Sequence, residues 1–191
     1  MGRVWEEQVI PGLYTVGMNP LEDSRGAFHK ILAQIPANLE PLTFDEIYWS
    51  SSQTGVARGM HFQVPPHHGR KLVFATSGSV VDLVVDLRVG SPTFQHVWEK
   101  QLNRQSQGVL IPAGCAHGFL VIDSPAVLVY AQEGAYDKDC DTGVSLKSLK
   151  ISQSTENLEF SERDAVLPQL TDFISPFTFD PTKFIGWNGQ A

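Results

Sequence analysis

Three histidines, two arginines and a lysine are concentrated in the segment RGMHFQVPPHHGRKLV, residues 58–73. An apolar run that contains His61 is followed by two prolines and then by a second apolar run that begins at Lys71. If the chain reverses at PPHHG, His61 and Lys71 lie on neighbouring antiparallel strands, where opposed Cβ atoms are about 4.5–5.5 Å apart. An ammonium group disfavours protonation of a nearby imidazole, so this pair would provide a base at neutral pH.

Another histidine, His117, stands in the segment IPAGCAHGF, where a Pro-Gly turn leads into a strand. In many metal-binding barrels such a histidine is a ligand, together with a His-x-His pair and a glutamate. The earlier hairpin here has Gln63 in place of the second histidine of that pair. His67 and His68 are adjacent, so in a regular strand they would point to opposite faces. We expect no metal in the site, and a metal-dependent reaction is the alternative.

The composition limits the kind of protein and its partners. A chain of 191 residues fits one domain better than two, and its net charge of −7 argues against a nucleic-acid partner. The first residues, MGRVWEEQVIPGLY, lack the apolar core of a signal peptide, and no apolar run is long enough to cross a bilayer. We therefore expect a cytoplasmic protein with no membrane partner, in which Cys115 and Cys140 are free thiols.

Glycine, proline, asparagine or aspartate interrupts the middle of the chain about every 8–12 residues, which indicates an antiparallel sandwich or barrel. In residues 71–87, Ser77-Gly78 predicts a turn between two strands. The strand after it alternates apolar residues on a dry face with Asp82 and Asp86 on the other face. The apolar residues of that face are Val81, Leu83, Val85 and Leu87.

The later part of the chain continues this pattern and then loses it. Residues 107–122 predict two strands joined by a turn at 112–114, and residues 126–136 predict a further strand. Residues 160–172 carry charges followed by a proline, which indicates a short helix. The aromatic tail, residues 172–191, has no clear period, and the pattern leaves open whether it packs on the core.

Five segments together resemble the dTDP-4-dehydrorhamnose 3,5-epimerase family. They are DSRGAF (23–28), GVARGMHFQVPPHHGRKLV (55–73), GSVVDLVVDLRVGSPTF (78–94), IPAGCAHGF (111–119) and SERDA (161–165). The resemblance implies an all-β fold, a cupin-type jelly-roll barrel with a few short helices. It also implies a homodimer that uses no cofactor and no metal, and a substrate that is a nucleotide-linked 4-keto-6-deoxy sugar.

The resemblance also implies one domain over residues 1–191. Its N-terminal strands and a segment that reaches the partner would extend to about residue 40. The barrel would then occupy about residues 41–150, and a C-terminal cover and tail would occupy about residues 151–191.

By position, four residues match the catalytic groups of that family. His61 corresponds to the general base, Asp164 to the carboxylate that orients it, Lys71 to the group that stabilises the enolate and Tyr130 to the acid on the opposite face. Inversion requires two proton-transferring groups, because a single group that returned its own proton would restore the original configuration. Without the resemblance, Asp164 would be interpreted as a carboxylate at the start of a helix.

Five further residues match substrate-binding positions of the family. Arg25 and Phe28 would reach the nucleotide from the partner subunit, and Arg58 would meet the sugar or a phosphate, for which its planar fork is suited. His117 would line or support the sugar pocket, and Tyr136 would stack on the base. The alternative for Tyr136 is a half-buried tyrosine at a sheet edge.

The chain departs from the family where amide side chains recognise thymine. Glu46 and Tyr48 occupy those positions, while Ser50 is kept. A carboxylate cannot donate the hydrogen bonds of an amide, so Glu46 is suited to accept them from the amino group of another base. The sequence leaves open whether C3, C5 or both are inverted. The alternative to an epimerase is a metal-dependent or non-catalytic sugar-binding protein of the same fold.

Overall fold

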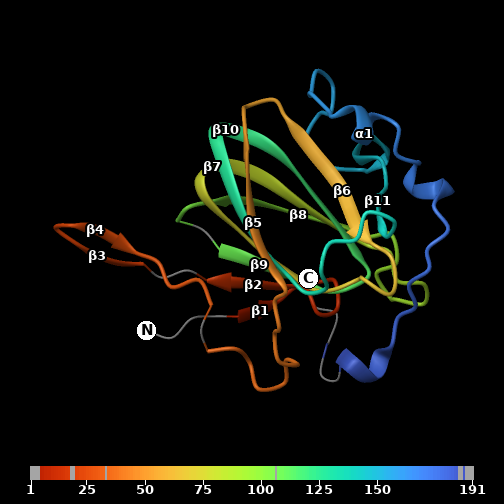
Figure 1. Cartoon of the computed structure of the whole chain (residues 1–191), viewed down its shortest axis with the longest axis horizontal. Coiled ribbons are helices and arrows are strands. Elements are labelled where there is room, and N and C mark those ends of the chain that lie inside the picture. The colour runs from red at the N-terminus through yellow and green to blue at the C-terminus, as the bar shows by residue number, and fades with distance from the viewer. Residues whose placement is uncertain (1–4, 18–19, 33, 106, 185–186, 188–191) are drawn as a thin grey trace.

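The computed structural model describes residues 5–17, 20–32, 34–105, 107–184 and 187, and most of its regular structure is β. Two long strands, β7 (Lys71–Asp86) and β10 (Cys115–Gln132), pair with each other in antiparallel fashion along most of their length. Both strands bend, so each contributes to two walls of the barrel (Figure 1). Within the described residues, all the remaining strands of the barrel join this pair, either directly or through one or two intermediate strands.

One wall combines the start of β7 with the end of β10, and it continues through β9 to β2 and β1 and through β10 to β5. The second wall combines the end of β7 with the start of β10, and it adds β8 on one side and β6 and β11 on the other. The strands of these walls are β1 Trp5–Glu7, β2 Tyr14–Gly17, β5 Glu46–Ser52, β6 Ala57–Gln63, β8 Val97–Asn103, β9 Gln107–Ile111 and β11 Asp141–Gly143. This arrangement is the jelly-roll barrel that the sequence predicted.

The predicted turn at Ser77-Gly78 is wrong, because β7 continues through it. Gly78 has a φ of 64°, and a Cβ atom there would lie 2.3 Å from the carbonyl oxygen of Asp123. The glycine therefore permits a bend inside the strand, where the register with β10 shifts, and not a reversal between two strands. A turn signal in the sequence does not distinguish these outcomes, since both need a residue with positive φ.

The expected pairing of the His61 strand with the Lys71 strand is also wrong. The β6 and β7 strands are separated by β10, so His61 pairs with His117 of β10 and not with a residue of β7. Lys71 pairs with Gln132 at the other end of β10. The chain does reverse between Gln63 and Lys71, but a third strand comes to lie between the two arms.

Alternation along β7 gives two buried faces and not one. The four apolar residues from Val81 to Leu87 pack together as predicted, but against the C-terminal part of the chain, where Leu146, Leu170 and Phe177 lie. Asp82 and Asp86 point to the other face, and both are completely buried. Each is paired with a cationic or imidazole partner, Asp82 with His117 and Asp86 with Arg88, and such partners are what a buried carboxylate requires.

The short helices lie in the C-terminal part of the chain. They are η1 Leu146–Ser148, α1 Glu162–Ala165, η2 Leu170–Asp172 and η3 Pro181–Phe184. The helix expected within residues 160–172 is thus present as α1, and Pro168 follows it. The described part of the aromatic tail packs on the barrel, where Phe177 is buried in the same apolar cluster as Val81 and Leu87. Residues 185–186 and 188–191 of the tail lie outside the described residues.

A separate hairpin, β3 (Leu21–Asp23) and β4 (Gly26–Phe28), projects away from the barrel (Figure 1). Its residues are exposed, including the large apolar side chains Leu21 and Phe28. Residues 1–4 of the predicted N-terminal strands lie outside the described part of the chain. No helix within the described residues is long and apolar enough to cross a membrane.

Replacing Gly78 tests the bend in β7, and Gly90 provides a matched control. Both glycines have positive φ, but a Cβ atom at Gly90 would meet nothing within 4 Å. An alanine costs about 1–2 kcal/mol at either position through backbone strain. We expect Gly78→Ala to cost about 1–3 kcal/mol more than Gly90→Ala, because its methyl group overlaps backbone. Urea unfolding measures both losses, and equal losses would contradict the close contact.

Candidate active site

A cavity of about 540 Å³ lies between the two walls of the barrel. It is lined by side chains from β5, β6, β7 and β10, and by others that follow β10 in the sequence. The predicted site residues that line it are Glu46, Tyr48, Arg58, His61, Lys71, His117, Tyr130 and Tyr136. Residues from segments 46–50, 58–71 and 117–136 thus meet in one concave site, which is the arrangement expected of a binding pocket for a small molecule.

Asp164 lies behind His61 and not in the cavity wall. Its Oδ1 atom is 2.6 Å from His61 Nε2, and its Oδ2 atom accepts a hydrogen bond of 3.1 Å from the backbone N–H of Gly59. Burial opposes ionisation of this carboxyl group, but its interactions with His61, the N–H of Gly59 and Ser161 together outweigh burial, so the pKa of Asp164 is lowered. An ionised carboxylate can only accept, so Nε2 carries a hydrogen, and the neutral form of this imidazole has its lone pair on Nδ1.

The start of helix α1 fixes the position of Asp164. The Ser161 hydroxyl caps the helix by accepting a hydrogen bond of 3.1 Å from the backbone N–H of Asp164. The carboxylate is therefore also the acidic residue at a helix start that the sequence alone suggested, and the two interpretations are compatible.

Tyr130 reaches the cavity from β10. Its hydroxyl lies 3.1 Å from the hydroxyl of Ser50, and its ring stacks on that of Tyr48, with the ring centres 4.9 Å apart. Burial raises the pKa of the Tyr130 phenol well above its usual range, and the hydrogen bond with Ser50 offsets only part of this effect. The phenol therefore stays protonated at neutral pH and is available as a proton donor.

Lys71 is placed in the cavity with an ion pair close to it. Burial lowers the pKa of the Lys71 ammonium to about 8, while the charge of Asp141 opposes this effect and that of Arg163 adds to it. Arg163 and Asp141 are themselves paired at 2.8 Å. The lysine is therefore a cation at neutral pH whose charge is sensitive to its neighbours.

Two more polar side chains are held by buried partners. His117 Nε2 lies 2.7 Å from Asp82 Oδ1, inside the barrel, and its ring contacts that of Tyr130 edge to face. Arg58 donates a hydrogen bond of 2.8 Å from Nε to the hydroxyl of Ser52. Each of these contacts fixes the orientation of a side chain that also faces the cavity.

The residues expected to contact the nucleotide base lie where β5 meets the segment that follows β10. Glu46 accepts a hydrogen bond of 2.8 Å from the backbone N–H of Tyr136, and the Tyr48 hydroxyl donates one of 3.1 Å to Gln132. Burial, with the charges of Glu46 and Asp141, raises the pKa of Tyr48 to about 12. Glu46 thus holds Tyr136 at the cavity, where its ring is largely exposed.

Arg25 and Phe28 do not line the cavity of their own chain. They lie on the projecting hairpin, where Arg25 forms an ion pair with Asp23 and Phe28 is exposed. Their placement leaves the expected contact with a partner subunit as a prediction.

Comparison with known proteins identifies the family. A family model described as dTDP-4-dehydrorhamnose 3,5-epimerase matches residues 7–172. The chain belongs to this family. A dTDP-4-dehydrorhamnose 3,5-epimerase of Pseudomonas aeruginosa is 46% identical over 125 residues, which are 63% of this chain and 68% of that protein. The chain is therefore an isomerase, as the resemblance implied.

Solved structures of the epimerase family have the same fold. NovW of Streptomyces spheroides, a 4-keto-6-deoxy sugar epimerase, is 31% identical with a TM-score of 0.84, covering 90% of this chain and 89% of that chain. ChmJ of Streptomyces bikiniensis, a 3'-monoepimerase in complex with dTDP-quinovose, is 26% identical with a TM-score of 0.78, covering 85% of each chain. The cupin-type jelly roll expected from the sequence is confirmed.

The cavity of this epimerase-family chain also contains polar residues that the sequence analysis missed. Gln63 and Gln132 each stand two residues after a predicted catalytic residue, so strand alternation could have placed them on the same face. Strand alternation could not have placed Asp141 and Arg163 in the cavity. They belong to the short elements β11 and α1, which come after the long strands that line the cavity.

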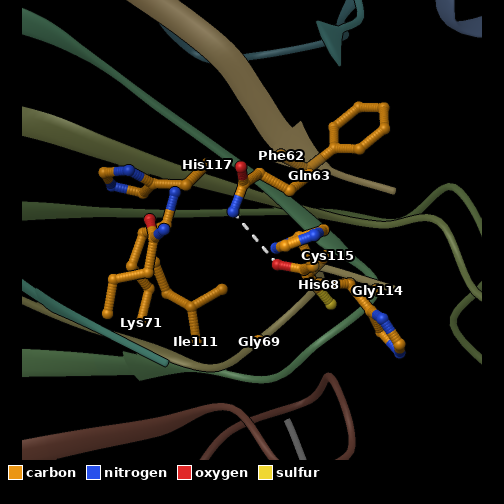
Figure 2. A pocket seen from close by; sticks show the side chains of 11 residues that line it. Phe62, Gln63, His68, Gly69, Lys71, Ile111, Gly114, Cys115 and His117 are labelled. Atoms are coloured by element: carbon orange, nitrogen blue, oxygen red, sulfur yellow. Dashed lines mark hydrogen bonds between the residues drawn. The ribbon is translucent and has the colours of Figure 1, made fainter. Parts of the chain in front are cut away.

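A smaller cavity of about 20 Å³ shares part of its lining with the main one. Figure 2 shows the side chains that line this smaller cavity. His117, Gln63 and Lys71 line both cavities, while His68 and Cys115 line only the smaller one. The dashed line in Figure 2 is the hydrogen bond of 3.0 Å that the Gln63 amide donates to the carbonyl oxygen of His67. The smaller cavity has room for about one water molecule and is too small for a substrate.

The lowered pKa of Lys71 can be measured directly. After reductive ¹³C-methylation, the Lys71 resonance, assigned by its loss in Lys71→Gln, should titrate near pH 8 and not near the ordinary lysine value of about 10.4. Asp141→Asn should lower this pKa further and Arg163→Gln should raise it, because their charges act in opposite directions. A Lys71 pKa that does not respond to either change would contradict the electrostatic account.

Proposed function

We propose that the protein inverts C3, C5 or both of a nucleotide-linked 4-keto-6-deoxy sugar, in the cytoplasm, by proton removal and return on opposite faces. The observation that carries this proposal is that a carboxylate-bound histidine, His61, and a buried phenol, Tyr130, line one cavity together with Lys71. The family of the chain and the activities of NovW and ChmJ support the same class of substrate.

His61 would remove the proton. Its Nε2 atom is engaged by Asp164, so Nδ1 is the atom with a free lone pair, and the imidazolium that forms is stabilised by the adjacent carboxylate. The electrons of the broken C–H bond move into the bond between that carbon and C4, and the C4 ketone oxygen becomes an enolate oxygen.

Lys71 would stabilise the negative charge on that oxygen. A carbon acid beside a ketone is too weak for an imidazole base unless the developing oxyanion meets a preorganised positive charge. One such donor typically contributes about 10²- to 10³-fold in rate. Lys71 fits this role because it is a cation at neutral pH in a site largely shielded from water.

Tyr130 would return a proton to the other face of the same carbon. Its raised pKa keeps the hydroxyl protonated until the enolate forms, and Ser50 and the stacked ring of Tyr48 hold it in place. Proton transfer from the phenol to carbon completes the inversion; the phenolate then recovers a proton from solvent, and the His61 imidazolium releases one to solvent.

The remaining polar side chains would bind the nucleotide. Arg58 and Arg163 supply positive charge for the phosphates, on a chain whose net charge is −7. Tyr136 would stack on the base, with Glu46 anchoring its backbone. Glu46 and Tyr48 replace the amide side chains that recognise thymine in the family, so the identity of the base is open. Guanine and cytosine nucleotides should therefore be tested beside thymine nucleotides.

The alternative function, a sugar-binding protein of the same fold, is less well supported. A protein that only binds a sugar has no need of a histidine oriented by a buried carboxylate or of a buried phenol in the same cavity. The cavity also lacks the second histidine of the His-x-His pair at Gln63, so the metal-binding pattern of related barrels is incomplete among the described residues.

Deuterium incorporation tests the reaction and its position together. The wild-type protein, incubated in D₂O with 4-keto-6-deoxy sugars linked to dTDP, GDP and CDP, should introduce deuterium at C3, C5 or both of its substrate. His61→Asn should reduce this exchange by about 10²- to 10⁴-fold, the usual contribution of a general base. Proton NMR of the sugar, recorded during incubation, measures the exchange at each carbon.

His68→Asn is the matched control for that experiment. His68 lies in the loop after β6 and packs near Phe177, outside the cavity. The His68→Asn substitution should leave deuterium exchange unchanged. Both His61→Asn and His68→Asn should bind the nucleoside diphosphate with wild-type affinity. Wild-type exchange by folded His61→Asn would refute the assignment of the base.

A shared active site predicts complementation between two inactive variants. We propose a homodimer in which Arg25 and Phe28 on the exposed hairpin reach the partner's cavity. Arg25→Ala should then bind substrate weakly, and His61→Asn should be inactive. After the two variants are mixed and exchanged, hybrid dimers carry one complete site, so activity should reappear. Lack of recovery in proven hybrids, or a fully active monomer in sedimentation, would contradict the shared site.

A further inference from the structure

A second group of reactive side chains lies where the loop after β6 meets the loop after β10. His67, Asp137 and Cys140 each offer one ligand atom, and these atoms all lie within 4.8 Å of one another. His67 Nε2 and Asp137 Oδ2 are 3.5 Å apart. Ligands at 2.0–2.3 Å from a tetrahedral ion are about 3–4 Å from one another, so the three side chains need only small adjustments to share one ion.

The types of ligand favour a particular metal. An imidazole nitrogen, a thiolate sulfur and a carboxylate oxygen form the mixed set that suits zinc, whereas magnesium and calcium take oxygen ligands. Cys140 is a free cysteine and is partly exposed, as are His67 and Asp137, so an ion can reach all three from solvent. Three protein ligands would leave a fourth position for water.

Hydrogen bonds between the Gln63 side chain and the backbone of both loops hold the loops together before any ion binds. The Gln63 amide donates to the carbonyl oxygens of His67 and Ala135, at 3.0 and 3.3 Å, and its oxygen accepts the N–H of Asp137 at 2.6 Å. Figure 2 shows the first of these bonds. Gly134 has a φ of 76°, and a Cβ atom there would lie 2.7 Å from the carbonyl oxygen of His67. The loops therefore hold the ligand residues close together without a metal.

The two carboxylate oxygens of Asp137 have different partners. Asp137 Oδ1 accepts the backbone N–H groups of Asp139 and Cys140, which leaves Oδ2 on the side of His67. His68, the next residue, packs near Phe177 instead. The two histidines lie in a loop and not in the regular strand that the sequence analysis considered, and they have different neighbours.

The charge of Asp137 at this junction favours binding of a cation. Hydrogen bonds from the backbone N–H of Asp139 and of Cys140 lower the pKa of Asp137, so this residue is an anion at neutral pH. Burial and the charge of Asp137 raise the pKa of the Cys140 thiol, because a thiolate there would face another anion. A divalent cation would reverse this preference, and the thiol would release its proton to solvent as the metal–sulfur bond forms.

We propose that His67, Asp137 and Cys140 form a zinc site that links the two loops at the edge of the active-site cavity. The neighbours of these ligands line that cavity: Tyr136 precedes Asp137, and Asp141 follows Cys140. Bound zinc would therefore fix the loop that carries both residues. The site is separate from the proposed proton-transfer groups, and its existence does not depend on the reaction.

Cobalt titration tests the site with a spectroscopic readout. Protein freed of metal with a chelator and then desalted should bind one Co²⁺ per chain and develop a near-ultraviolet band of thiolate-to-cobalt charge transfer. Zinc should abolish the band by displacement. Cys140→Ser should lose the band, and since Cys115 remains as a buried thiol in this variant, the loss assigns the ligand. His67→Gln and Asp137→Asn should weaken binding by more than about 10-fold, the scale reached by loss of even an outer contact.

Adjacent residues of the same types provide the controls. His68→Gln and Asp139→Asn should retain the band and the wild-type affinity, and thermal unfolding without metal should establish that every variant is folded. Affinity should also fall as the pH is lowered, since the thiol must lose its proton. Absence of the charge-transfer band in the wild type, or equal affinity in the ligand variants and the controls, would overturn the proposal.

Discussion

The antiparallel pairing of β7 with β10 is the interaction on which the arrangement of the site depends. Backbone hydrogen bonds between these strands extend from the Cys115–Asp86 pair to the Gln132–Lys71 pair, across a bend that turns one ladder into two walls. His117 and Tyr130 lie near opposite ends of β10, and the bend brings them into ring contact inside the barrel. Each end then recruits a further strand, β6 with His61 and β5 with Tyr48.

This construction separates the acid–base properties of groups that share a small volume. The pKa of Asp164 is lowered although burial alone would raise it, because His61 and the N–H of Gly59 interact with its ionised form. Tyr130 lacks comparable stabilisation of its anion, so burial raises its pKa. Burial also lowers the pKa of Lys71, since here it disfavours a cation. The same loss of water thus leaves a protonated phenol, an imidazole oriented by a carboxylate and a cation whose charge responds to its neighbours.

Alternation with a period of two predicted much of the β structure, because it fixes which side chains share a face. The cavity residues Tyr130 and Tyr48 were predicted through the family resemblance, and His61 both through it and through its place in a strand-like run; all three line the cavity. The order of the strands was not predictable by such means. His61 and Lys71 stand on either side of an evident reversal, yet β10 lies between their strands because long-range pairing decides which edges meet.

Similar limits explain the other differences between expectation and structure. Gly78 carries a turn signal, but its positive φ serves a bend within β7. Asp82 alternates with apolar residues as an exposed residue would, but the other side of the strand is the barrel interior, where His117 is its partner. Arg163 lies in a helix of four residues, and only the packing of that helix on β6 brings it to the cavity. In each case the deciding contact comes from a distant part of the chain.

The central claim is that two different groups, His61 and Tyr130, handle the proton on opposite faces of one carbon. The most direct measurement is the ratio of deuterium incorporated to epimer formed in D₂O, followed by NMR with an excess of enzyme. Tyr130→Phe keeps the ring and its stacking on Tyr48 but removes the donor, so His61 should return deuterium to the original face. The account predicts labelled, inverted sugar from the wild type and labelled but mostly uninverted sugar from the variant. Equal inversion by both proteins would contradict it.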